Sequence, residues 1–209
     1  MIYKYDTRYI VEFKDKTRAS YSAKRYGPLL ELVTQQAEQE DRKIWNYYIK
    51  YEDYVEIQYW EQKTETVKSI LIDYDMIDIV YNSYWQLNHN GYAQTRANGQ
   101  KTYLHHLVMN TNTTVDHINR IRTDNRRCNL RVCNTFSDNG INQSLSVRNT
   151  SGHVGVWFDS DVSGPNKWRG RFQYKYKEYT QYFATYEEAC AWVDSEKDYI
   201  IKYQKTFND

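Results

Sequence analysis

Apolar and polar positions along this chain predict a series of short strands and few helices. Residues 2–13, IYKYDTRYIVEF, partly alternate apolar with polar side chains, which is typical of a strand with one buried face. Residues 28–43 begin with Pro28, which is favoured in the first turn of a helix, and an apolar face that includes Leu30 and Val33 follows. We therefore predict an N-terminal strand followed by a helix.

Three more apolar runs predict strands at residues 44–51, 54–60 and 67–73, with a turn at Glu52-Asp53 between the first two. These elements would form a small α+β unit, in which we see no residue pattern that indicates chemistry.

The pattern of apolar and polar residues changes after residue 74. Short ordered runs alternate with Asn90-Gly91 and Asn98-Gly99, and Asn-Gly pairs favour hairpin turns. Further along, residues 134–147 are rich in Asn and Ser but carry apolar residues at mixed helical spacing, and they predict a short helix.

The C-terminal part of the chain has the clearest pattern. It predicts strands at residues 153–159, 167–174 and 179–185. Thr185 and Glu188 then form a capping box, which marks the start of an amphipathic helix. The candidates for the buried face of this helix are Ala189, Trp192, Val193, Ile200 and Tyr203. We predict a three-stranded antiparallel sheet packed on one helix.

Charge is nearly balanced over the 209 residues, with a net charge of +1, but it is unevenly distributed. Residues 1–100 carry 13 Lys/Arg and 15 Asp/Glu, net −2, whereas residues 101–209 carry 15 and 12, net +3. A local cluster is what an anionic partner senses, because salt screens charges beyond about 8–10 Å. The 22 tyrosines are explained more simply by half-exposed strands than by base stacking.

The cysteines and the hydropathy predict an intracellular, cytoplasmic setting with no membrane partner. The cysteines number three, an odd count, and no apolar run is long enough to span a bilayer. Cys128 and Cys133 lack a second pair of ligands at suitable spacing, so we expect no structural zinc.

Residues 115–131, VDHINRIRTDNRRCNLR, concentrate groups suited to phosphodiester hydrolysis. Such hydrolysis needs a cation that neutralises the phosphate and a base that deprotonates a water. His117 has a side chain suited to the base, and Asp116 supplies an oxygen ligand for a hard cation such as Mg²⁺. Each feature alone is common, since arginine runs are usually solvated surface. Their combined spacing favours a functional site.

That spacing resembles the HNH endonucleases, the ββα-metal or His-Me finger group, and in particular their phage and intron-associated branch. The resemblance lies in Val-Asp-His-Ile (115–118), Asp-Asn-Arg (124–126), Asn-Leu-Arg (129–131) and Asp-Asn-Gly-Ile-Asn (138–142), preceded by YLHHLVM (103–109). It implies that His117 is the general base, that Asp116 binds a divalent metal and that Asn129 orients His117. Asn139 would be the second metal ligand, with Asp138 as the alternative.

The resemblance also implies supporting roles for His105 and Asn125. The arginines of the motif would hold DNA phosphates, which position the protein on the duplex. They are Arg120, Arg122, Arg126, Arg127 and Arg131.

In the C-terminal sheet, Lys167, Arg169, Arg171 and Gln173 fall at every second position, so they share one face, with Trp168 and Phe172 on the other. The residues TSGHVGVWFD, KWRGRF and YFATYEEACAWV resemble the Apetala2-type DNA-binding domain. That resemblance implies that the sheet enters the major groove and that Lys167, Arg169, Arg171 and Gln173 bind DNA.

The sequence therefore predicts an α+β chain with three domains. They are an N-terminal α+β unit of unknown role (1–69), an HNH ββα-metal nuclease module (70–147) and an Apetala2-like domain (148–209). The expected function is a site-selective DNA endonuclease of the homing type that leaves 5′-phosphate and 3′-hydroxyl ends. It would use Mg²⁺, or alternatively Mn²⁺, and no small-molecule cofactor. The alternatives are an HNH restriction endonuclease and a non-cleaving DNA-binding regulator. Double-stranded DNA is the expected partner, and a homodimer is left open.

Overall fold

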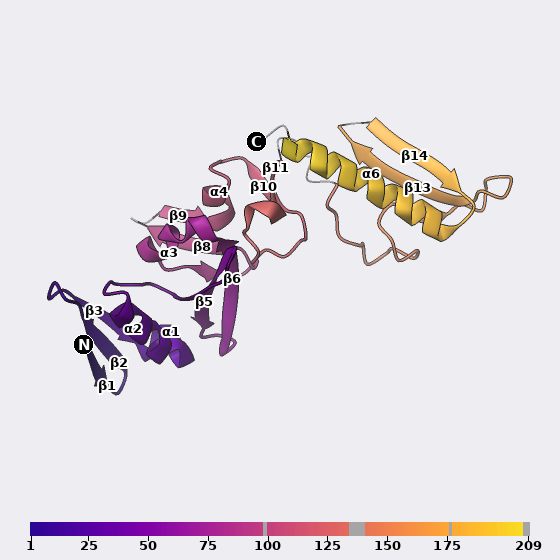
Figure 1. The fold of residues 1–209 in the computed structure, drawn as a ribbon. Helices are drawn as coiled ribbons and strands as arrows, with labels where there is room; N and C mark the ends of the chain where they lie inside the picture. Colours follow the sequence, from indigo (N-terminus) through magenta and orange to yellow (C-terminus); the bar gives the residue numbers. More distant parts are fainter. Residues whose placement is uncertain (98–99, 134–140, 176, 207–209) are drawn as a thin grey trace. The chain divides into compact units, whose positions relative to one another are not determined.

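The chain is an α+β protein built from small sheets and short helices (Figure 1). The computed structural model describes residues 1–97, 100–133, 141–175 and 177–206. It divides into two compact units. Unit 1 consists of residues 1–112 and 121–130, and unit 2 consists of residues 113–120 and 131–209. Residues 121–130 fold with unit 1, and the three-domain division expected from the sequence stays a prediction.

Unit 1 begins with a three-stranded antiparallel sheet, and its strands are β1 (Ile2–Tyr5), β2 (Arg8–Glu12) and β3 (Arg18–Ser22). The expectation of one strand over 2–13 is therefore wrong, since the chain reverses between β1 and β2. The polar segment before residue 23 was not predicted as a strand. It becomes β3 because Ala19 and Tyr21 alternate into the core.

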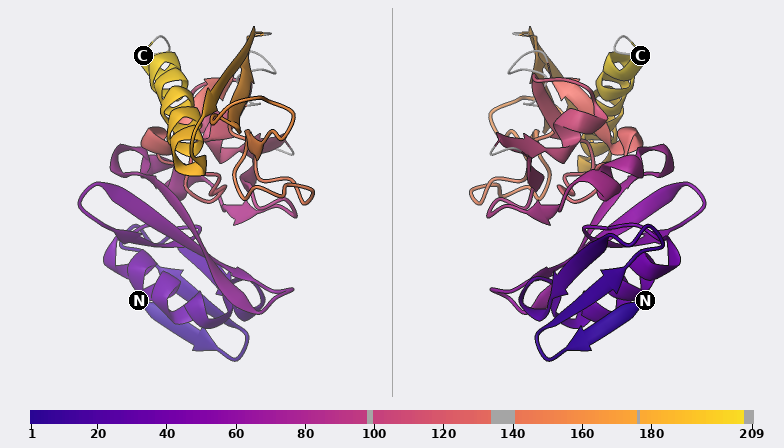
Figure 2. Two further views of the ribbon diagram at one scale, coloured as in Figure 1. Left: turned by 90° about the vertical axis from the view of Figure 1, so that its right-hand side faces the viewer. Right: turned by 90° about the vertical axis from the view of Figure 1, so that its left-hand side faces the viewer.

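Three short helical elements follow: α1 (Ala23–Tyr26), η1 (Gly27–Leu29) and α2 (Leu30–Gln39). The helix expected over 28–43 is confirmed in its centre. A second antiparallel sheet has the strands β4 (Tyr47–Lys50), β5 (Tyr54–Glu61) and β6 (Thr66–Asp73), close to the predicted runs. The helix α2 contacts β1–β3 and β4, so helices lie between the two sheets (Figures 1 and 2).

The rest of unit 1 is a string of short elements: η2 (Tyr74–Met76), α3 (Asp78–Asn82), β7 (Gln86–Leu87), β8 (Ala93–Ala97), β9 (Gln100–Tyr103) and α4 (Leu104–Val108). The expected turn at Asn90-Gly91 joins β7 to β8. The expected turn at Asn98-Gly99 lies outside the described residues.

Residues 115–131, the motif that contains Asp116 and His117, include most of β10 (Thr114–His117) and the start of β11 (Leu130–Cys133), which pair in a two-stranded sheet. A short 3-10 helix, η3 (Arg127–Asn129), precedes β11. Of the helix expected over 134–147, residues 134–140 lie outside the described residues, and residues 141–147 form turns and irregular chain.

The C-terminal sheet of unit 2 is antiparallel and packs on one helix, as expected (Figure 1). Its elements are β12 (Val156–Phe158), β13 (Trp168–Tyr174), β14 (Lys177–Phe183) and α6 (Tyr186–Thr206). Thr185 and Glu188 form the predicted reciprocal cap of α6. The side chains of Ala189 and Val193 are buried against the sheet, whereas Tyr203 is exposed, which corrects its assignment to the buried face.

No helix in the described part of the chain is long and apolar enough to cross a membrane.

Candidate functional site

Asp116 and His117 lie at the end of β10 and point to opposite sides of the strand. The alternation follows from the sequence, because Val115 and His117 occupy the buried side while Asp116 is only partly covered. His117 is 3% exposed, so the packing holds its imidazole in place. A general base needs one ring nitrogen within about 2.6–3.2 Å of the proton that it takes.

The carboxylate of Asp116 is held by an arginine on the neighbouring strand. Arg131 on β11 donates from Nε at 3.1 Å and from a terminal nitrogen at 2.8 Å, both to Oδ2 of Asp116. The side chain of Arg131 is only 1% exposed. A guanidinium buried in this way neutralises Asp116 and does not face solvent. This placement corrects the expectation that Arg131 binds a DNA phosphate.

Asn142 connects three parts of the motif, although the sequence analysis did not single it out. Its Nδ2 donates to Oδ2 of Asp116 at 3.1 Å and to the carbonyl of His117 at 2.7 Å. Its Oδ1 accepts from Nε of Arg120 at 3.0 Å. Asn142 is the second asparagine of the Asp-Asn-Gly-Ile-Asn segment, and this position is the sequence signal that could have identified it. One amide therefore ties the 141–142 segment to the Asp-His pair.

Asp116 has the chemistry of a ligand for a hard divalent cation. All three of its hydrogen bonds use Oδ2, and Oδ1 makes no hydrogen bond with any residue that the structure describes. Its side chain is partly open to solvent. Mg²⁺ binds few protein oxygens and keeps waters for the rest, so one free carboxylate oxygen suits it. The expected second ligand, Asn139, and its alternative Asp138 lie outside the described residues.

Residues 121–130 form a loop that is organised within unit 1. Leu71 on β6 donates to the carbonyl of Thr123 at 2.8 Å, and the backbone N–H of Asn125 donates to the carbonyl of Leu71 at 2.8 Å. The side chain of Asn125 is fully buried and donates to the carbonyl of Thr123. Asn129 donates from Nδ2 to the carbonyl of Asp124 at 2.8 Å. Through these bonds, Asn125 and Asn129 stabilise the conformation of the loop. That Asn129 orients His117 stays a prediction.

Two arginines of this loop are paired with carboxylates. Arg126 donates to both oxygens of Asp124 at 2.8 Å, and the hydrogen bond raises the pKa of Arg126. Arg127 bonds to Asp75, which raises the pKa of Arg127 and lowers the pKa of Asp75, and it lies 3.6 Å from Asp73. A DNA phosphate at either arginine would compete with these acids.

The other two arginines keep their charge available. Arg122 donates to the carbonyl of Asn90 at 2.7 Å and stacks on the ring of Tyr92, 4.8 Å from its centroid. Arg120 is bound to the neutral amide of Asn142. Neither arginine forms an ion pair with any carboxylate in the described part of the chain. Arg120 and Arg122 are thus the arginines of the motif best placed for phosphate contacts.

His105 lies on α4 in unit 1, where it is buried. Its ring stacks on Tyr103, with 5.4 Å between centroids, and meets the edge of Tyr92. This packing places His105 among buried aromatic rings of unit 1, and its supporting role in the site stays a prediction.

A cavity of about 440 Å³ lies beside the motif within unit 2. The charged and polar residues on its wall include Arg120, Asn142, His153, Asp194, Lys197 and Asp198. His153 lies 3.1 Å from Asp194, and burial lowers the pKa of Lys197. The acids Asp194 and Asp198 offset the bases Arg120 and Lys197, so the charge on the wall of this cavity is balanced.

The outer face of the C-terminal sheet carries Arg169, Arg171 and Gln173 on β13, as the alternation predicted, with Phe172 buried on the helix side. Arg169 lies between two aromatic rings, 5.0 Å from the centroid of Trp157 and 5.6 Å from that of Tyr182. Glu178 on β14 bonds to Arg169 at 3.3 Å and to Arg171 at 2.7 Å. Lys167 lies just before β13. The face is therefore basic and aromatic, with two acids, Glu178 and Asp159, of which Asp159 accepts from the hydroxyl of Tyr182.

Comparisons of this chain with models of protein families, with curated proteins and with solved structures find no match.

Proposed function

We propose that this protein is a metal-dependent, site-selective DNA endonuclease of the HNH type, with a homing role as the first hypothesis. The observation that supports it best is the junction at Asn142. Its amide brings together the adjacent Asp116 and His117 with a segment 25 residues further along the chain. Asp116 has one carboxylate oxygen that bonds to no residue in the described part of the chain, and it is adjacent to His117, so the pair supplies a cation ligand and a base, the two groups that metal-assisted hydrolysis of a phosphodiester uses.

Each residue of the site has a distinct task in this proposal. His117 takes the proton of the attacking water, and Asn129 keeps its ring in one orientation. Asp116 and Asn139 would hold the divalent ion, which supplies charge neutralisation at the scissile phosphate and the leaving oxygen. Arg120 and Arg122 bind phosphates of the strand. Water adds across the P–O3′ bond, so the products are a 5′-phosphate and a 3′-hydroxyl.

The C-terminal sheet would anchor the protein on double-stranded DNA. A stacked guanidinium such as that of Arg169 is held in one orientation, and arginine can read guanine while glutamine can read adenine in the major groove. Lys167, Arg171 and Gln173 extend the same surface. Since one site cuts one strand, a monomer should nick DNA, and a double-strand break needs a dimer or two successive nicks.

The replacement His117→Ala tests the proposal. Supercoiled plasmid is incubated with wild type or variant in Mg²⁺, in Mn²⁺ and in EDTA, and nicking is followed on gels. We expect the variant to lose cleavage by at least about 10²-fold, the usual range for a general base, while DNA binding is retained. His89→Ala is the matched control, because His89 is exposed. Normal cutting by the His117 variant, or cutting by wild type in EDTA, contradicts the assignment.

One observation favours a second candidate, a DNA-binding regulator that does not cut. Arg131 already neutralises Asp116, and a carboxylate engaged in this way binds a cation less strongly. The plasmid assay separates the two: a regulator binds DNA with a salt-sensitive affinity and leaves the plasmid supercoiled in every metal. Mapping the cut ends on a randomised DNA library then distinguishes a homing enzyme from a restriction enzyme by the length of the recognised site.

A further inference from the structure

The N-terminal sheet has an outer face that the proposed function leaves without a task. The strand register divides the residues of this sheet between two faces. The helix α2 covers the face that holds Val11, Ala19 and Tyr21, and the other face is the outer one. The residues of the outer face are Tyr3, Tyr5, Arg8, Ile10, Glu12, Arg18, Ser20 and Ser22. Exposed strand faces of soluble proteins are usually mixed and polar, whereas this one combines tyrosine rings, arginines and small hydroxyl residues.

Each arginine of this face is placed over a tyrosine ring. The guanidinium of Arg8 lies 5.6 Å from the ring centroid of Tyr5, and that of Arg18 lies 5.6 Å from the ring centroid of Tyr3. Tyr5 is 52% exposed, and the side chain of Arg18 is 62% exposed. Stacking on a ring orients a guanidinium. Arg8 forms no ion pair with any residue that the structure describes, whereas Arg18 also donates to Glu12.

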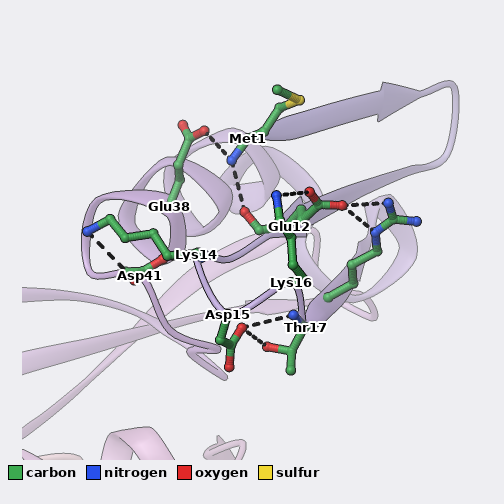
Figure 3. A network of polar contacts seen from close by, with 9 residues as sticks. Met1, Glu12, Lys14, Asp15, Lys16, Thr17, Glu38 and Asp41 are labelled. Carbon is green, nitrogen blue, oxygen red and sulfur yellow. Dashed lines mark hydrogen bonds and ion pairs between the residues drawn. The ribbon is translucent and has the colours of Figure 1, made fainter.

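Glu12, the acid of this face, is already neutralised. It accepts from Arg18 at 2.8 Å and lies 3.7 Å from Lys16, and the hydrogen bond from Arg18 lowers the pKa of Glu12 (Figure 3). Asp15 in the neighbouring turn accepts hydrogen bonds from the backbone N–H and the hydroxyl of Thr17, and Lys14 forms an ion pair with Asp41 (Figure 3). With Arg8, Lys16 and Arg18 against Glu12, the face keeps a net positive charge.

The sequence segregates charge around this face. Residues 1–27 carry seven Lys/Arg and three Asp/Glu, net +4, whereas residues 28–100 carry six and twelve, net −6. Lys4 and Lys14 of the first set are paired with Glu31 and Asp41 of the second, and the positive charge that remains on the outer face attracts a polyanion. It opposes pairing of this face with a second copy of itself, because Arg8 and Arg18 would then meet like charges.

The same arrangement occurs on the C-terminal sheet, which is also three antiparallel strands with a helix on one face. There, Arg169 stacks on Trp157 and Tyr182, and Glu178 pairs with two arginines. Two sheets of one chain thus present stacked arginines, aromatic rings, hydroxyl side chains and one neutralised glutamate.

We infer that the outer face of β1–β3 is a second DNA-binding surface, which holds the phosphate backbone of duplex DNA flanking the cleavage position. Arg8 and Arg18 donate to phosphate oxygens, Tyr3 and Tyr5 hold them in place, and Ser20 offers a hydroxyl to the backbone. The inference rests on the proposed function for the identity of the partner. It predicts that the protein covers more DNA than the C-terminal sheet and the nuclease motif alone would cover.

The test compares full-length wild type with Arg8→Ala/Arg18→Ala on one long DNA fragment that contains the mapped cleavage site. The slope of log affinity against log salt should fall by about one to two units in the double variant, since each phosphate contact contributes about 0.9 and Arg18 is already paired with Glu12. The hydroxyl-radical footprint should shorten at one end, and the position of the cut should stay unchanged. Arg8→Lys/Arg18→Lys should keep the slope, because lysine still binds phosphate. Lys50→Ala/Lys63→Ala removes two exposed charges elsewhere in unit 1 and should change neither slope nor footprint.

The outcomes separate the inference from the proposed function. If wild type binds no DNA, the proposed function and the partner chosen here both fail. If wild type binds and cuts DNA but Arg8→Ala/Arg18→Ala keeps the full footprint and slope, the inference alone fails. A change of the double variant from dimer to monomer in sedimentation, with an unchanged footprint, would assign this face to self-association and would also overturn the inference.

Discussion

Arg131→Met separates what the sequence suggested about Arg131 from what the structure shows. Methionine keeps most of the side-chain volume and removes the charge that faces Asp116. The two hydrogen bonds of 2.8 and 3.1 Å and the 1% exposure of Arg131 describe a buried ion pair. Removing one partner of such a pair costs about 3–5 kcal/mol, because the remaining charge is left uncompensated. Asp116 keeps its bond to Asn142, so we expect the lower end, about 3 kcal/mol.

The measurement is a double-mutant cycle with Asp116→Asn, in which Arg131→Met/Asp116→Asn should be less destabilised than the sum of the single variants by about 2 kcal/mol. The chain has two compact units, so urea unfolding alone does not report the stability of one of them. Hydrogen exchange of the β10 and β11 amides is therefore measured as well, because it gives the local opening free energy. The salt slope of DNA binding should not change in Arg131→Met. A coupling below about 0.5 kcal/mol together with a reduced slope would show that Arg131 contacts phosphate and that the reasoning from burial is wrong.

Four further outcomes are expected. Asn142→Ala should lower the nicking rate about 10- to 100-fold with DNA affinity retained, as is usual for a residue that positions a metal ligand; equal loss of binding and nicking would contradict this. Arg122→Gln should reduce the salt slope by about one unit, measured by gel-shift titrations, whereas Arg127→Gln should reduce it less because two carboxylates already hold that side chain. Gly155→Ala should destabilise the protein by about 2 kcal/mol in urea unfolding, since Gly155 has φ of +85° and a Cβ would lie 2.3 Å from the carbonyl oxygen of Arg171. Thr185→Ala should cost about 1 kcal/mol through loss of the α6 cap, and Thr185→Ser should restore it.

Local pattern was sufficient for the elements whose apolar residues recur regularly. β5 and β6 each alternate between core and surface, and both were predicted within a residue or two. The start of α6 was predicted from Thr185 and Glu188, because a capping box is a contact between residues three apart. The reversal between β1 and β2 was missed, since Asp6-Thr7 lacks the Gly or Pro that usually marks a turn.

The candidate site was predicted in its residue types but not in its contacts. The Asp116-His117 pair and the two faces of β13 follow from adjacency and from the period of a strand. The partner of Arg131 is 15 residues away, and the partners of Arg127 are 52 and 54 residues away. Nothing in the local sequence distinguishes these arginines from Arg122, which keeps its charge available.

The sequence alone determined which chemical groups this protein has and which short segments form strands or helices, because neighbouring residues fix backbone preference and side-chain alternation. Only the tertiary structure decided which charges are compensated. Coulomb attraction and the loss of hydration depend on distance in space and on burial, so five arginines of one motif divide into carboxylate-bound and available ones only once the chain has folded.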